Sequence, residues 1–164
     1  GIIKQIPDLT GLADTSFMAR KIGEDKRLIC AAPSYLARHG MPQRPADLAR
    51  HNCIVSRDHP YLNRWSFKVD GRIIEIDVRG RVAVTEGEAQ MQLALQGIGI
   101  VRLTRLTLAQ SIRDGALVPL LGAFSAEEAV GIHAVYPHRR HLAPKVPAFV
   151  NFLIEKFTPP PWEI

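Results

Sequence analysis

Apolar and polar positions alternate along this chain with two periods, one typical of strands and one typical of helices. Apolar residues occupy every second position of 65–69 and of 74–78, and the turn pair Asp70-Gly71 lies between the two runs, which predicts a β-hairpin. Residues 144–157 carry apolar side chains at a spacing of about 3.6 residues, which predicts an amphipathic helix. The alternation of such elements predicts an α/β domain built on a mixed sheet.

Shorter apolar runs and capping residues predict the other elements. We expect Ser34 to cap one helix, and Thr85 and Glu88 to form a capping box at the start of another. The predicted strands cover 27–32, 53–55, 81–84, 99–103, 117–120 and 132–136. The predicted helices cover 35–39, 46–50, 85–97 and 105–114, with a loop at 56–64.

Composition limits the classes of protein to be considered. The 164 residues are 46% hydrophobic, enough for a folded core, and no apolar run approaches the roughly 18 residues of a membrane helix. The net charge is +5, but the basic residues are scattered apart from 138–141, so we expect no direct DNA binding by this chain. Cys30 and Cys53 lie in apolar runs, and the start does not resemble a secretory signal, so we expect buried reduced thiols and a cytoplasmic protein.

Motifs for catalysis, cofactors and metals are absent from the sequence. The glycines of Gly97-Ile98-Gly99 follow a predicted helix and precede a strand, so they predict a helix C-cap rather than a phosphate-binding loop. His51-x-Cys53 lacks the further ligands that a zinc site needs. We therefore expect no enzyme, no metal and no cofactor.

The predicted helix over 85–97 has two apolar faces. Its main stripe consists of Met91, Ala94, Leu95 and Ile98, which we assign to the core. Ala89 and Leu93 form a second, smaller face. This second face is buried either within its own domain or against another subunit, and the pattern does not decide between the two.

Several segments together resemble one family. Residues 27–36 (RLICAAPSYL), 93–100 (LALQGIGI) and 115–121 (GALVPLL) look like parts of the effector-binding domain of LysR-type transcriptional regulators. Each segment alone is weakly specific, but the shared order extends from about residue 12 to residue 157. The other matching segments are 12–23, 45–48, 65–67, 135–137 and 142–149.

The resemblance implies a fold similar to type II periplasmic binding proteins, with two subdomains. Residues 28–133 would form a complete subdomain II, and residues 1–27 and 134–164 would form part of subdomain I. We expect the chain to be truncated at its front, without the winged helix-turn-helix through which such a protein binds DNA. A small-molecule effector would bind in the cleft between the subdomains, and the protein would form homo-oligomers, either dimers or tetramers.

The resemblance also implies which residues contact the effector. They would lie at the end of one strand, at the start of a helix and along a further strand: Ser56, Arg57, Thr85, Glu86, Val101 and Arg102. The charge of Glu86 would oppose a carboxylate ligand, whereas Arg57 or Arg102 could offset it, so the charge of the ligand stays open. The alternatives are a solute-binding protein of a transporter, which shares the fold, and thirdly an enzyme on this fold.

Overall fold

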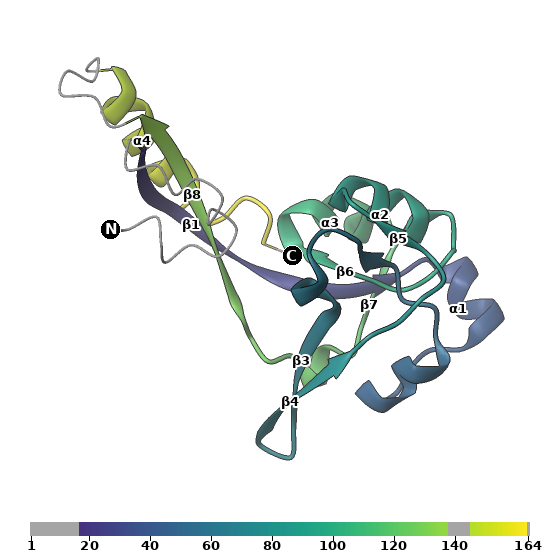
Figure 1. Ribbon diagram of the computed structural model, residues 1–164. Coiled ribbons are helices and arrows are strands. Elements are labelled where there is room, and N and C mark those ends of the chain that lie inside the picture. Colours follow the sequence, from purple (N-terminus) through teal and green to yellow (C-terminus); the bar gives the residue numbers. More distant parts are fainter. Residues whose placement is uncertain (1–16, 138–144, 164) are drawn as a thin grey trace. The chain divides into compact units, whose positions relative to one another are not determined.

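The computed structural model describes residues 17–137 and 145–163, and the chain divides into two compact units (Figure 1). One unit consists of Lys26–Ala129, and the other of Gly1–Asp25 with Val130–Glu163. Strands β1 (Phe17–Ala31) and β8 (Ala129–Pro137) each contribute residues to both units. The identification of these units with subdomains II and I remains a prediction from the resemblance.

The Lys26–Ala129 unit is built around the second half of β1. This strand pairs antiparallel with β6 (Val101–Thr104) on one side and β7 (Val118–Leu120) on the other. Helices α2 (Gly87–Leu95) and α3 (Arg105–Arg113) cover one face of this sheet (Figure 1). The remaining elements of the unit are α1 (Pro33–His39), the strands β2 (Val55–Ser56), β3 (Arg64–Val69), β4 (Arg72–Asp77) and β5 (Ala83–Val84), and the 3-10 helices η3 (Pro45–Arg50), η4 (Pro60–Asn63) and η5 (Gly122–Phe124).

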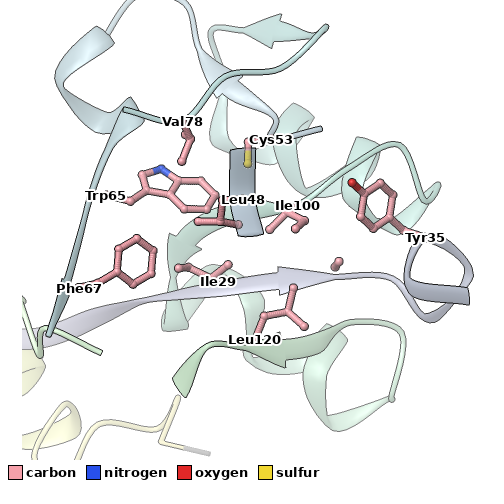
Figure 2. Packing of buried hydrophobic residues seen from close by; sticks show 10 residues of the cluster. Ile29, Tyr35, Leu48, Cys53, Trp65, Phe67, Val78, Ile100 and Leu120 are labelled. Atoms are coloured by element: carbon pink, nitrogen blue, oxygen red, sulfur yellow. The ribbon is translucent and has the colours of Figure 1, made fainter. Parts of the chain in front are cut away.

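Both faces of the central strand are buried, because neighbouring β1 residues belong to different core clusters. Ile29 and Ala31 pack with the cluster that contains Trp65 and Phe67 (Figure 2). Cys30 faces the opposite way, toward the second cluster below α2 and α3. A strand buried on both faces has a continuous apolar run. The run at 27–32 predicted the end of this strand, but β1 already begins at Phe17, which the prediction missed.

The predicted hairpin is confirmed as β3 and β4, which pair antiparallel from Arg64↔Asp77 to Val69↔Arg72. Asp70 and Gly71 both have positive φ, 49° and 76°, as the tight turn between the strands requires. Trp65 and Phe67 are buried.

Helix α2 ends as predicted and begins differently. The N–H of Gly97 donates to the carbonyl of Ala94 and that of Ile98 to the carbonyl of Leu93, the Schellman arrangement, with Gly97 at φ 69°. The predicted capping box of Thr85 and Glu88 is wrong, because the helix begins two residues later. Glu86 is the N-cap, and no side chain caps the first turn.

Other boundaries also differ. Ser34 is not an N-cap, because α1 already begins at Pro33 with Ala32 as the N-cap. The predicted helix over 46–50 is a 3-10 helix, and the loop over 56–64 contains η4. Of the predicted strand 53–55, only Val55 belongs to β2, which pairs parallel with β5 (Val55↔Ala83 and Ser56↔Val84). Cys53 forms an isolated bridge with Ile100.

In the other unit, β8 pairs with β1, and helix α4 (Lys145–Lys156) follows the strands. Val150 of α4 is buried, and the ring of Phe157 packs edge-on against Trp162 with centroids 5.1 Å apart. Phe149 of the predicted apolar stripe is 59% exposed. The described residues therefore cover only part of that stripe.

The two cysteines are free thiols with no exposed surface, as predicted. Burial raises the pKa of each thiol to about 12, so both stay protonated at neutral pH. Their place in the two core clusters makes them small apolar core residues.

Candidate effector-binding site

A pocket of about 220 Å³ lies within the Lys26–Ala129 unit, and we call it the Ser56 pocket. Its wall is formed by side chains from β1, the segment 54–65, the start of α2 and strand β6. The lining residues are Arg27, Ile54, Ser56, His59, Leu62, Asn63, Trp65, Thr85, Gly87, Gln90, Arg102, Leu103 and Thr104.

Strand pairing brings two of the predicted site residues together. Because β2 and β5 are parallel, their carboxyl ends lie at the same edge, which places Ser56 beside Val84 and therefore near Thr85. The Asn63 side chain holds this edge: its Oδ1 accepts the Ser56 N–H at 2.7 Å, and its Nδ2 donates to the Ser56 carbonyl at 2.8 Å. Such an edge is where α/β folds commonly bind ligands.

Arg102 contributes a buried cation to the pocket. Its side chain is 8% exposed, and its Nη2 lies 2.6 Å from Oε2 of Glu128. Burial lowers the pKa of Arg102 and the Glu128 carboxylate raises it, with burial the stronger. Burial raises the pKa of the Glu128 carboxyl, whereas hydrogen bonds from Ser66 and Arg102 lower it. The hydrogen bonds have the larger combined effect, so the pKa of Glu128 lies below its ordinary value.

The lining of the Ser56 pocket suits an anion. It contains two arginines and a histidine, and none of its lining residues is an aspartate or a glutamate. Gly87 lies in the first turn of α2, whose N–H groups have no side-chain cap, and a helix N-terminus adds a partial positive charge. The buried indole of Trp65 adds an apolar surface.

The structure brings together part of the predicted site. Ser56, Thr85 and Arg102 line the pocket. Arg57 and Glu86 are exposed and Val101 is fully buried in the core below α2, and none of these three lines it. Glu86 itself does not line the pocket, whereas its two chain neighbours, Thr85 and Gly87, do. The lining residues that the sequence did not single out include Arg27, Trp65 and Gln90, which lie in three separate elements.

The predicted second face of α2 is half-buried. Ala89 and Leu93 are both partly exposed, and Leu93 packs against the core cluster that contains Ala94. Ile98, assigned to the core stripe from the sequence, is 40% exposed, which contradicts that assignment. It follows the Schellman turn and lies outside the helix, so the helical period no longer places it on the buried face.

Two negative findings apply to residues 17–137 and 145–163. No group of three or more His, Cys, Asp or Glu side chains is placed to hold a metal ion. No helix in this part of the chain is long and apolar enough to span a bilayer.

Relatives of known class cover most of this chain. HTH-type transcriptional regulator CrgA of Neisseria meningitidis serogroup B is 30% identical over 145 residues, which is 88% of this chain and 48% of the relative. HTH-type transcriptional regulator DmlR of Escherichia coli is 31% identical over 144 residues, or 87% of this chain and 46% of the relative. The chain thus spans about half the length of the curated relatives it matches.

Solved structures show the same fold. The regulatory domain of CrgA, a LysR-type transcriptional regulator from Neisseria meningitidis, superposes with a TM-score of 0.81 at 29% identity, covering 88% of this chain and 71% of that one. The regulatory domain of AphB in Vibrio vulnificus gives a TM-score of 0.67 at 31% identity, covering 87% and 70%. The fold class, α/β and similar to type II periplasmic binding proteins, is confirmed.

The fold is that of the regulatory domain of a transcriptional regulator. A family model described as the LysR substrate binding domain matches residues 1–158. The chain belongs to this family, and it is the effector-binding domain of a LysR-type transcriptional regulator. The matched proteins are named as transcriptional regulators and their regulatory domains, not as enzymes or as solute-binding proteins of transporters.

Proposed function

We propose that this domain binds a small anionic effector, most simply a carboxylate, in the Ser56 pocket. The observation that carries the proposal is that Arg27 and Arg102 both line a pocket whose lining contains no carboxylate. The hydroxyls of Ser56 and Thr85 and the first turn of α2 supply further hydrogen-bond donors. Ligand binding would favour one conformation of the domain over another, which is how an effector changes the activity of a regulator.

Titration calorimetry of the 164-residue chain with small carboxylates and their neutral amides tests this proposal. We expect a carboxylate to bind and its amide to bind at least about tenfold more weakly, because hydrogen bonds to charged groups contribute about 1.5–3 kcal/mol. Thr85→Ala should weaken binding of that carboxylate about tenfold, because it removes a donor at the pocket edge.

Ser111→Ala is the matched control, because it removes a hydroxyl from α3 that does not line the pocket, and it should leave the affinity unchanged. If neither Thr85→Ala nor Ser56→Ala changes the affinity of the bound carboxylate, the effector does not occupy the Ser56 pocket.

We also propose that the domain self-associates through the face of α2 that carries Ala89 and Leu93. Leu93 contributes to the core of its own unit, so Leu93→Arg would damage folding as well as an interface. Ala89 is half-buried and belongs to neither core cluster. Ala89→Arg should therefore weaken self-association by about tenfold or more while the thermal midpoint falls little.

Sedimentation equilibrium of the chain and of Ala89→Arg measures this effect. Gln92→Arg, at an exposed position of the same helix, is the control for added charge. An unchanged association constant for Ala89→Arg would exclude this face of α2 as the interface.

For the whole protein, we propose transcriptional control in the cytoplasm by a dimer or tetramer that binds DNA through a helix-turn-helix domain. Support comes from the names of the relatives, which are HTH-type transcriptional regulators about twice as long as the matched segments. The scattered basic residues of this chain argue against DNA binding by the effector domain itself.

A further inference from the structure

A second concave surface of the Lys26–Ala129 unit is strongly basic, and we call it the basic hollow. It is open to solvent, has a volume of about 440 Å³ and shares no lining residue with the Ser56 pocket. Three arginines and two histidines line it, together with the Tyr35 and Asn52 side chains, and none of its lining residues is an aspartate or a glutamate. The basic side chains are Arg50, Arg79, Arg81, His39 and His51.

The backbone contacts that hold the basic hollow together are close. A Cβ atom on Gly80 would lie 1.7 Å from the carbonyl oxygen of Cys53, so only glycine allows segment 79–81 to approach the backbone at Cys53 this closely. The N–H of Cys53 donates to the carbonyl of Arg79 at 3.1 Å, and the N–H of Arg81 donates to Oδ1 of Asn52 at 2.7 Å. These bonds fix the backbone of two arginines on either side of the glycine.

A buried tyrosine anchors the other wall. The Tyr35 hydroxyl accepts the Asn52 N–H at 2.9 Å and lies 3.1 Å from Nδ1 of His51. The His39 ring packs against the Tyr35 ring at an interplanar angle of 30°, with centroids 4.6 Å apart. Both histidines of the basic hollow are therefore held by the same buried ring.

The positive charge of the basic hollow is only partly compensated. Arg50 pairs with Oδ1 of Asp47 at 2.9 Å. Within the described part of the chain, no carboxylate lies within ion-pair distance of Arg79 or Arg81. Burial is the main cause that lowers the pKa of His51. The positive charges of His39 and Arg50 lower it further, and the carboxylate of Asp47 opposes them.

We propose that the basic hollow is a second anion-binding site, separate from the Ser56 pocket, for a compact phosphate-bearing molecule. Cationic side chains converge on it from three segments of the chain, at 39, 50–51 and 79–81. Guanidinium groups bind phosphate oxygens with paired, charge-assisted hydrogen bonds. A concave site with convergent cations encloses a small polyanion, whereas a nucleic acid duplex needs an extended basic surface. Such a site would let a phosphorylated compound act on the domain independently of the effector.

Pyrophosphate binding to the 164-residue chain tests this proposal, with the ring signals of His51 followed by NMR at constant ionic strength. A bound anion stabilises the imidazolium, so pyrophosphate should raise the pKa of His51. The double variant Arg79→Gln/Arg81→Gln should bind pyrophosphate at least about tenfold more weakly. Arg72→Gln/Arg113→Gln, which removes the same charge at exposed positions outside the basic hollow, should bind it as the unchanged chain does.

Arg102→Gln separates the two sites, because Arg102 lines the Ser56 pocket and does not line the basic hollow, so this variant should leave the His51 response intact. The proposal is overturned if saturating pyrophosphate leaves the pKa of His51 unchanged in the unmodified chain. It is also overturned if Arg79→Gln/Arg81→Gln retains the full His51 response, or if Arg72→Gln/Arg113→Gln loses as much of that response as Arg79→Gln/Arg81→Gln does. A pyrophosphate effect confined to the amide signals of Ser56 and Thr85 would also overturn it, and would support anion binding in the Ser56 pocket instead.

Discussion

Gly80→Ala is expected to destabilise the domain by about 3 kcal/mol or more, one of the largest effects of a single methyl group on this chain. The added Cβ would lie 1.7 Å from the Cys53 carbonyl oxygen and 2.9 Å from Oδ1 of Asn52. Relief of this overlap requires segment 79–81 to move away, which breaks the hydrogen bond from Cys53 to Arg79. Because Cys53 belongs to a core cluster, the strain extends into the core.

Denaturation followed by circular dichroism measures this loss, and the thermal midpoint should fall by about 10 °C. Gly122→Ala is the matched control, because nothing lies within 4 Å of its added Cβ and it should change the midpoint little. If Gly80→Ala and Gly122→Ala have similar midpoints, segment 79–81 does not approach Cys53 as closely as described. Since the same contact shapes the basic hollow, any Gly80→Ala protein that folds should also bind pyrophosphate weakly.

The features that were predictable from sequence depend on local patterns. Alternation and the Asp70-Gly71 turn defined the β3–β4 hairpin, because register and turn are both set within fourteen residues. The run at 27–32 indicated the buried end of the central strand, and Gly97 indicated the end of α2. In contrast, Thr85 and Glu88 have the spacing of a capping box, yet the pairing of Val84 with Ser56 ends one residue before Thr85 and the helix begins only at Gly87. The start of α2 therefore follows the pairing of β5 with β2, which are distant in sequence, and not the local spacing of Thr85 and Glu88.

The candidate site was less predictable, because its walls come from distant segments. The resemblance indicated Ser56, Thr85 and Arg102, and these line one pocket. Arg27 lies opposite Thr104 in the β1–β6 ladder, a register that no local pattern of the sequence encodes. The partner of Arg102, Glu128, is 26 residues further along the chain. The basic hollow was missed for the same reason, since His39 and Arg50 are far in sequence from Arg79 and Arg81.

Arg102→Gln is expected to weaken binding of the carboxylate effector at the Ser56 pocket about 100-fold, a larger effect than that expected of Thr85→Ala. The variant keeps a polar side chain of similar length but loses a cation with an 8% exposed side chain, and charge-assisted hydrogen bonds contribute up to about 3 kcal/mol. Arg72→Gln is the control, because it removes the same charge from an exposed position on β4. If both variants bind the carboxylate equally well, Arg102 does not contact the effector.

Glu128→Gln should have the opposite effect and raise the affinity up to about tenfold, because Glu128 competes with the effector carboxylate for the Arg102 guanidinium.

The ion pair of Glu128 with Arg102 also makes the stability of the fold depend on pH. The pKa of Glu128 is depressed in the folded chain, so its pairing stabilises the fold above the unfolded pKa, and this stabilisation is lost as the pH falls through the folded value. With Glu128 41% exposed, solvent screening keeps that contribution small. Calorimetry at neutral pH measures the affinity of Glu128→Gln for the carboxylate effector. An affinity at or below that of the unchanged chain would show that the ion pair orients Arg102 for the effector and does not compete with it.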